Sequence, residues 1–146
     1  MENYRLYIDS DDFKLYKEIK SKTFLKDYVK ENRQIFMMAV LIGKYVLKEK
    51  LPLENKKDYI RYDSLQNLEE MDLLTSLAIV EKEDVNLLND IRETFDIMQE
   101  YANAGIKVLY KWTKNETEFQ NKITEVLINF YNINSSLINQ NRDENK

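Results

Sequence analysis

The stretch Ile-Phe-Met-Met-Ala-Val-Leu-Ile-Gly-Lys-Tyr-Val-Leu, residues 35–47, decides the fold of this chain. When residues 32–48 are wound into a helix, they leave hardly any polar face. A helix that is apolar on nearly all sides is normally covered by other elements on most of them. The segment ends before Pro52, because the residue that precedes a proline avoids the helical region. We therefore predict a buried central helix around which the domain is built.

Helical periodicity recurs along the rest of the chain. Apolar residues at steps of three and four predict helices over residues 13–21, 68–78, 91–112 and 119–131, with a short helical turn near residues 84–89. Four side chains offer N-caps for these helices: Ser10, Asn67, Asp90 and Asn115. Each of the last three is followed three residues later by a glutamate, which is the spacing of a capping pair.

Both glycines of the chain, Gly43 and Gly105, lie inside apolar helical patterns. A glycine in a helix costs about 1 kcal/mol relative to alanine. A packing role offsets such a cost, so we predict that each glycine allows two helices to cross at close range. Neither lies in a glycine-rich phosphate-binding motif.

Residues 4–9 alternate between two faces, with Tyr4, Leu6 and Ile8 on one of them. This period of two, with aromatic and β-branched residues, predicts a short strand. A single strand is not stable by itself. We expect it to pair either with residues 59–62 or with its own copy in a second chain.

These patterns predict a mainly α protein with one domain over residues 1–138. The domain should contain about five helices around the buried central helix, together with a short N-terminal β-strand. Residues 139–146 are polar, and we expect them to form a disordered tail. A chain of 146 residues is of the ordinary size for one domain.

The composition excludes several kinds of chemistry. The sequence contains no His and no Cys, which removes imidazole bases, thiol nucleophiles, disulfides and nearly all zinc sites. We expect no catalytic residue, no cofactor and no metal. The N-terminus lacks the pattern of a signal peptide, and the longest apolar run, residues 35–42, is far shorter than the ~20 residues of a membrane span. These features predict a cytoplasmic protein without membrane contact.

Charge is divided unevenly along the chain. Residues 1–62 hold 14 Lys/Arg and 10 Asp/Glu, whereas residues 63–146 hold 8 and 16. This division indicates either separate surfaces for an anionic and a cationic partner, or solvated helix faces that differ by chance. The net charge of −4 argues against strong nonspecific binding to nucleic acid.

Carboxylates cluster at two places where a hard cation is conceivable. One group shares a helix face and the other crowds a helix start: Glu93, Asp96 and Glu100, then Glu69, Glu70 and Asp72. No calcium-binding loop is present in the sequence, and acidic residues in first turns also match the helix dipole. The simpler interpretation is that both groups are solvated helix faces.

Cations interleaved with aromatic residues are the sequence signal for nucleic acid. The candidate contacts lie in the first strand and in the segment before residue 62: Arg5, Tyr7, Lys56, Lys57 and Arg61. A strand followed by two helices is also the order of ribbon-helix-helix proteins, in which paired strands from two chains enter the major groove. The alternative is a strand whose outward face is merely polar.

Four stretches resemble a small bacterial defence-associated family, DNA phosphorothioation-associated protein 4. They are Gln34-Ile35-Phe36-Met37-Met38-Ala39-Val40-Leu41-Ile42-Gly43, Leu51-Pro52-Leu53 with Tyr59-Ile60-Arg61-Tyr62, Leu73-Leu74 through Ala78, and Glu100-Tyr101-Ala102-Asn103-Ala104-Gly105-Ile106. The resemblance spans roughly residues 34–109. It implies a role in a defence system that marks or restricts DNA, and it carries over no catalytic residue.

Three hypotheses follow for the function. The favoured one is a non-enzymatic accessory or regulatory component of a DNA phosphorothioation-linked or related antiphage system, which contacts other proteins of that system. The second is a dimeric, sequence-specific DNA-binding regulator. The third is a metal-dependent nuclease subunit built on the carboxylates.

Overall fold

A computed structural model describes residues 4–126, 128–129 and 132 of the chain. Its elements, in chain order, are β1 (Arg5–Asp9), η1 (Ser10–Asp12), α1 (Phe13–Lys22), η2 (Phe24–Asp27), α2 (Asn32–Leu41), η3 (Ile42–Leu47), β2 (Lys56–Arg61), α3 (Tyr62–Leu65), α4 (Glu69–Lys82), η4 (Val85–Asn89) and α5 (Ile91–Trp112). Residues 116–126 are also helical. The predicted mainly α class is confirmed, whereas the tail predicted for residues 139–146 and the boundary at residue 138 lie outside the described residues.

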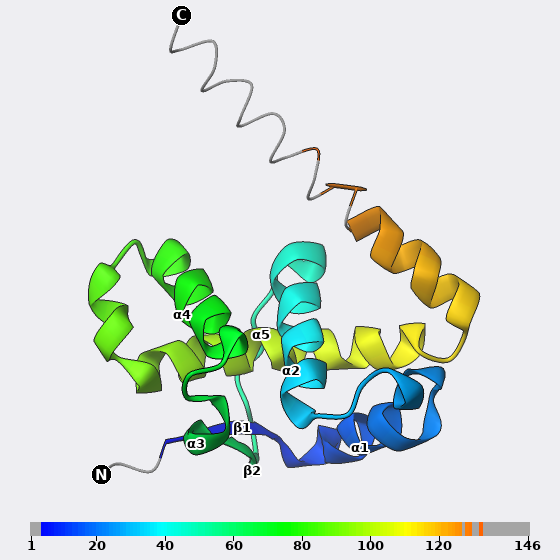
Figure 1. The fold of residues 1–146 in the computed structure, drawn as a ribbon, viewed down its shortest axis with the longest axis horizontal. Helices are drawn as coiled ribbons and strands as arrows, with labels where there is room; N and C mark the ends of the chain where they lie inside the picture. Colours follow the sequence, from blue (N-terminus) through cyan, green and yellow to red (C-terminus); the bar gives the residue numbers. More distant parts are fainter. Residues whose placement is uncertain (1–3, 127, 130–131, 133–146) are drawn as a thin grey trace, which may run out of the picture.

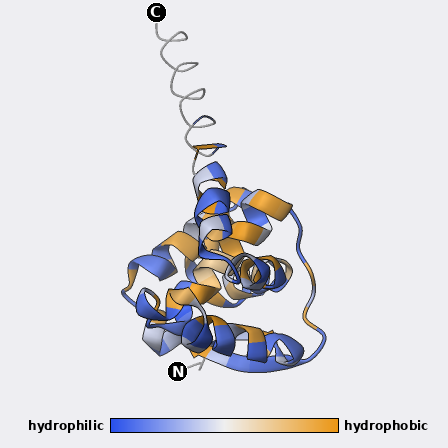
Figure 2. Cartoon of the chain, turned by 90° about the vertical axis from the view of Figure 1, so that its right-hand side faces the viewer, coloured by the Kyte–Doolittle hydropathy of each residue, from blue (hydrophilic) through white to orange (hydrophobic). Residues whose placement is uncertain are grey.

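The long helix α5 is the axis of the molecule, and α2 stands across it (Figure 1). Elements from all parts of the chain contact α5: β1, α1, α2, η3, α4 and η4. The hydrophobic colouring in Figure 2 gathers on the helices in the middle of the body. Within the described part of the chain, no helix is both apolar enough and long enough to cross a membrane.

The predicted central helix is present, but it changes its winding near its end. Ile35, Phe36 and Val40 of α2 are almost completely buried, as the all-round apolar pattern predicts. From Ile42 to Leu47 the backbone forms the π-helical segment η3 in place of further α-helix. The segment ends at Lys48, whose left-handed conformation has a φ of 54°.

The two glycines meet where this helix crosses α5. A Cβ on Gly105 would lie 1.9 Å from the carbonyl oxygen of Ala39, and one on Gly43 would lie 2.0 Å from that of Tyr101. Both distances are far below van der Waals contact, so the two backbones touch without intervening side chains. The prediction of a close helix crossing is confirmed for both residues.

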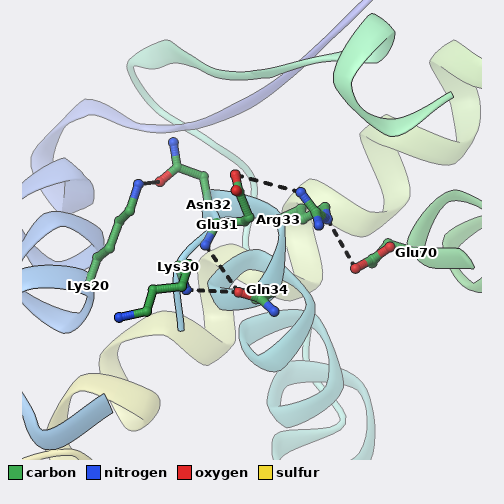
Figure 3. Close-up of polar contacts among 7 residues, drawn as sticks. All are labelled: Lys20, Lys30, Glu31, Asn32, Arg33, Gln34 and Glu70. Carbon is green, nitrogen blue, oxygen red and sulfur yellow. Dashed lines mark hydrogen bonds and ion pairs between the residues drawn. The ribbon is translucent and has the colours of Figure 1, made fainter. Parts of the chain in front are cut away.

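The start of α2 is fixed by polar contacts that the sequence analysis did not identify (Figure 3). The side-chain oxygen of Gln34 accepts hydrogen bonds from the backbone N–H groups of Lys30 and Glu31, at 3.0 and 3.1 Å. Arg33 extends the other way and pairs with Glu70 of α4, with 3.1 Å between Nε and Oε1. The same turn therefore caps α2 and ties it to α4.

Two of the four predicted N-caps are confirmed and two are wrong. Asp90 and Asn115 accept hydrogen bonds from the N–H groups of Glu93 and Glu118. Asp9, and not Ser10, caps the first helical turn, because the carboxylate of Asp9 accepts from the N–H of Asp11. Before α4, Asn67 adopts a positive φ of 71° and the helix starts after Leu68, so the side chain of Asn67 does not cap it.

The predicted strand pairs within the chain. β1 and β2 form a two-stranded antiparallel sheet, with an irregularity in register between Leu6 and Tyr7. Leu6 and Ile8 of β1 and Ile60 of β2 face the core and are buried. The alternation of residues 4–9 thus predicted both the strand and its inward face.

Candidate functional site

The sheet brings four of the five predicted nucleic-acid contacts together on one face. Arg5 lies opposite Arg61 in the register, and Asp9 lies opposite Lys56. Tyr7 projects from the same face of β1 as Arg5, because side chains two residues apart in a strand share a face. Two segments about fifty residues apart in the sequence therefore form one basic and aromatic surface, which we call the ribbon face: Arg5, Tyr7, Lys56 and Arg61. Lys57 lies opposite Ile8 in the register, so its side chain leaves the other face of the sheet.

Neighbouring groups modify the charge of the ribbon face. Arg5 is paired with Asp58 across the strands, with 2.8 Å between the guanidinium and the carboxylate. Lys56 lies over the ring of Tyr7 at 5.8 Å from its centroid, and Lys57 lies over the ring of Phe13 at 4.4 Å. Both lysines and Arg61 are exposed. The ribbon face is therefore cationic at two exposed positions, Lys56 and Arg61, while the charge of Arg5 is partly balanced.

One further cation, Arg92, lies near the sheet and carries no local sequence signal. Arg92, in the first turn of α5, lies over the ring of Tyr4 at 6.0 Å, and Tyr4 packs edge-on against Tyr62. No local pattern links Arg92 to the strand, because only the packing of α5 against β1 brings them together. Arg92 thus adds a cation near the start of β1, beside Tyr4.

The strand arrangement differs from that of a ribbon-helix-helix dimer. One edge of β1 is hydrogen bonded to β2 of the same chain. On this strand, the N–H of Tyr7 also donates to the side-chain oxygen of Gln99 on α5, at 2.6 Å. Of the two expected alternatives, pairing within the chain is therefore correct, although the partner strand spans residues 56–61 and not 59–62. Both β2 and α5 already form hydrogen bonds with β1. A ribbon made of one strand from each of two chains is not what the structure forms.

The carboxylate clusters do not converge. Within the described residues, no group of three or more Asp or Glu side chains is placed to hold a metal ion. Glu70 is paired with Arg33, and the N–H of Glu93 is capped by Asp90. Asp72 and Asp96 are exposed on their helices. These positions agree with solvated helix faces.

A second surface was not anticipated. Four aliphatic side chains on α4 and η4 are exposed: Leu73 at 42%, Val80 at 71%, Val85 at 69% and Leu88 at 65%. We call these four side chains the aliphatic row. Leu73 and Val80 are seven residues apart, or about two helical turns, so they share one face of α4. The inner face of α4, which includes Leu74 and Ala78, is buried in the core.

Polar contacts at both ends hold α4 against the body. At its start, Glu70 pairs with Arg33 of α2. Near its end, Glu81 accepts a hydrogen bond from the hydroxyl of Tyr101 and lies 3.6 Å from the ammonium of Lys50. Burial and the hydrogen bond to Glu81 raise the pKa of Tyr101 above its usual range, so the hydroxyl keeps its proton. The aliphatic row therefore rests on a helix fixed at both ends.

These features define a class of protein: a small helical domain with an intrachain β-ribbon, a basic surface on that ribbon and an aliphatic surface on α4 and η4. The profile of the family described as DNA sulphur modification system-associated protein 4 matches residues 5–144, so the chain belongs to this family. The resemblance found in residues 34–109 is thereby confirmed. No curated protein and no solved structure matches the chain.

Proposed function

We propose that this chain is a non-enzymatic accessory component of a DNA phosphorothioation-linked or related antiphage system, and that it acts by binding other proteins of that system. The observation that carries the proposal is the aliphatic row, which exposes four aliphatic side chains within sixteen residues of sequence. Exposed apolar side chains that gather in one place mark interaction surfaces more often than scattered ones do. The family description supplies the link to a DNA sulphur modification system.

Co-purification from the native host tests this proposal. A tagged copy of the chain should bring down proteins encoded by the same modification system. Val80→Asp should remove that association, because a carboxylate placed in an apolar contact must be desolvated without a partner. Ile128→Asp is the matched control, since it adds the same charge at another exposed aliphatic position, 53% accessible. Recovery of the chain as a lone monomer would contradict the proposal.

A second candidate function is direct DNA contact through the ribbon face. The observation that favours it is the gathering of Lys56 and Arg61 on the face of the sheet that carries Tyr7. Cations bind phosphates without regard to sequence, and aromatic rings offer surfaces for stacking bases. This candidate replaces the two-chain ribbon with a surface that a single chain provides.

Mobility shifts at low salt test the DNA candidate. Lys56→Ala and Arg61→Ala should each weaken DNA binding. Each should also lower by about one the number of ions released on binding, which is measured as the slope of log affinity against log salt concentration. Arg5→Ala should have a smaller effect than Arg61→Ala, because Asp58 already balances Arg5. Lys111→Ala, at an exposed position in the last turn of α5, is the control. If the wild-type chain shifts neither duplex nor single-stranded DNA at low salt, this candidate fails.

A further inference from the structure

We infer that the aliphatic row binds a basic amphipathic helix of a partner protein. The inference rests on the proposed function, and it specifies the chemistry of the partner. It follows from three features of α4 and η4: an apolar stripe that extends beyond the buried face of α4, neighbouring exposed carboxylates, and a poor match to the other occupants that the chain itself could supply.

The apolar surface of α4 extends beyond the part that is buried. Its inner face, with Met71, Leu74 and Leu77, packs into the core. Leu73 and Val80 are four residues before and three residues after Leu77, so they flank it along one side of the helix. Both side chains are exposed. The apolar stripe of α4 is therefore wider than the part that the described residues cover.

The row has the dimensions of a helix-binding surface. Leu73 and Val80 are about 10 Å apart along α4, given a rise of 1.5 Å per residue. Val85 and Leu88 are three residues apart in the 3-10 helix η4, so they also share a face. Amphipathic helices use anchors spaced over two to three turns to bind such surfaces.

Carboxylates surround the row. Residues 69–100 contain ten Asp/Glu and two Lys/Arg. Glu69 and Asp72 lie in the first turn of α4, next to Leu73, whereas Glu83 and Asp84 follow the end of α4 at the turn into η4; all four acidic residues are exposed. A partner that places Lys or Arg opposite this rim gains in encounter rate and in specificity.

A second copy of the chain fits this surface poorly. A symmetric dimer formed through the row would place the same patch on both sides of the contact. Two acidic rims would then face each other, and like charges across an interface cost several kcal/mol. The chain's own residues 127–146 are apolar in part, but they hold two Lys/Arg and two Asp/Glu and so provide no net positive charge.

A synthetic peptide serves as the probe. We expect a labelled Leu/Lys amphipathic helix to bind the full-length chain, measured by fluorescence anisotropy, and to bind more tightly than a Leu/Glu helix or a scrambled Leu/Lys peptide. Val80→Asp should weaken binding of the Leu/Lys helix about tenfold, since loss of a central anchor commonly costs that much. Ile128→Asp should not weaken it. Circular dichroism would verify that both variants are folded.

The sign of the Val80→Asp effect separates this inference from simple charge attraction. Added negative charge alone would strengthen binding of a Lys-rich peptide, so tighter binding by Val80→Asp would overturn the inference. Equal binding of the scrambled peptide would do so too. If light scattering showed that the wild-type chain is a dimer and that Val80→Asp is a monomer, the row would be assigned to a second copy of the chain. Tighter probe binding by the uncharged variant Leu137→Ser would instead assign the row to the chain's own C-terminal segment. Failure of the probe leaves the co-purification result intact, so the two proposals can fail separately.

Discussion

Replacing Gly105 by alanine should lower the free energy of unfolding by about 3 kcal/mol, which is at the upper end of the usual cost of overpacking. The new Cβ would lie 1.9 Å from the carbonyl oxygen of Ala39 and 2.8 Å from the backbone nitrogen of Gly43. Both atoms belong to backbone, so no side-chain rotation relieves the clash. At an exposed helical position, the same substitution would stabilise the chain by about 1 kcal/mol. Urea unfolding measures the difference, and a gain in stability would contradict the close crossing.

A double-mutant cycle sharpens this prediction. Gly43→Ala should also destabilise the chain, because its Cβ would lie 2.0 Å from the carbonyl oxygen of Tyr101. The double variant should cost less than the sum of the two single variants, since one separation of the helices relieves both clashes. Ser76→Ala, at an exposed position of α4, should change stability by less than about 0.5 kcal/mol. Strict additivity would mean that the glycines do not share one contact.

The second large effect is expected for Asp9→Ala, with a loss of about 2 kcal/mol, typical of a cap whose carboxylate is also hydrogen bonded elsewhere. The carboxylate of Asp9 is buried and accepts from the N–H of Asp11 at 3.1 Å and from that of Glu54 at 3.0 Å. It thus joins the first helical turn to the segment that leads into β2. Removing it leaves two backbone donors without this partner.

The contribution of Asp9 should depend on pH. The hydrogen bond from Glu54 is the main cause that lowers the pKa of Asp9 below its ordinary value of 3.8, against an opposing effect of burial. A carboxyl group whose pKa is lower in the folded than in the unfolded state stabilises the fold above its unfolded pKa. That stabilisation is lost as the pH falls through the folded pKa.

Urea unfolding of wild type and Asp9→Ala from neutral pH down to strongly acidic pH measures this effect. The difference between the two should be constant at neutral pH and should shrink below about pH 4. Asp9→Asn keeps one acceptor oxygen without the charge, so the stability of this variant should lack the contribution of Asp9 to the pH dependence. The contribution of Asp12 to the pH dependence of stability should have the opposite sign, because burial raises the pKa of Asp12. A difference between wild type and Asp9→Ala that persists unchanged at low pH would show that the carboxylate charge contributes nothing.

Patterns local in sequence predicted much of the fold. The apolar run of residues 35–47 gave the central helix, and the two glycines inside helical patterns gave the crossing. The caps show where such reasoning fails. Asp9 and Ser10 are both capable capping residues, and only the hydrogen bond from Glu54 to Asp9 distinguishes them. Likewise, the positive φ of Asn67 depends on how the chain turns from α3 into α4.

The candidate surfaces were predicted unevenly for the same reason. Arg5 and Arg61 could be proposed together because each lies in a segment with strand-forming residues. Arg92 could not, since the fold alone brings it to Tyr4. The aliphatic row was missed because Leu73 and Val80 are interleaved with the core residues Leu74 and Ala78. Sequence shows that a helix has a wide apolar stripe, but it does not show which part of that stripe remains uncovered.

Site-specific photo-crosslinking in the native host tests the proposed function most directly. A benzophenone amino acid placed at Val80 should form an adduct with a protein of the DNA sulphur modification system, identified by mass spectrometry. The same group at Tyr28, which is equally exposed at 71% and lies next to η2, should not form that adduct. Absence of an adduct at Val80, or the same adducts from both positions, would contradict the assignment of α4 and η4 as the contact surface.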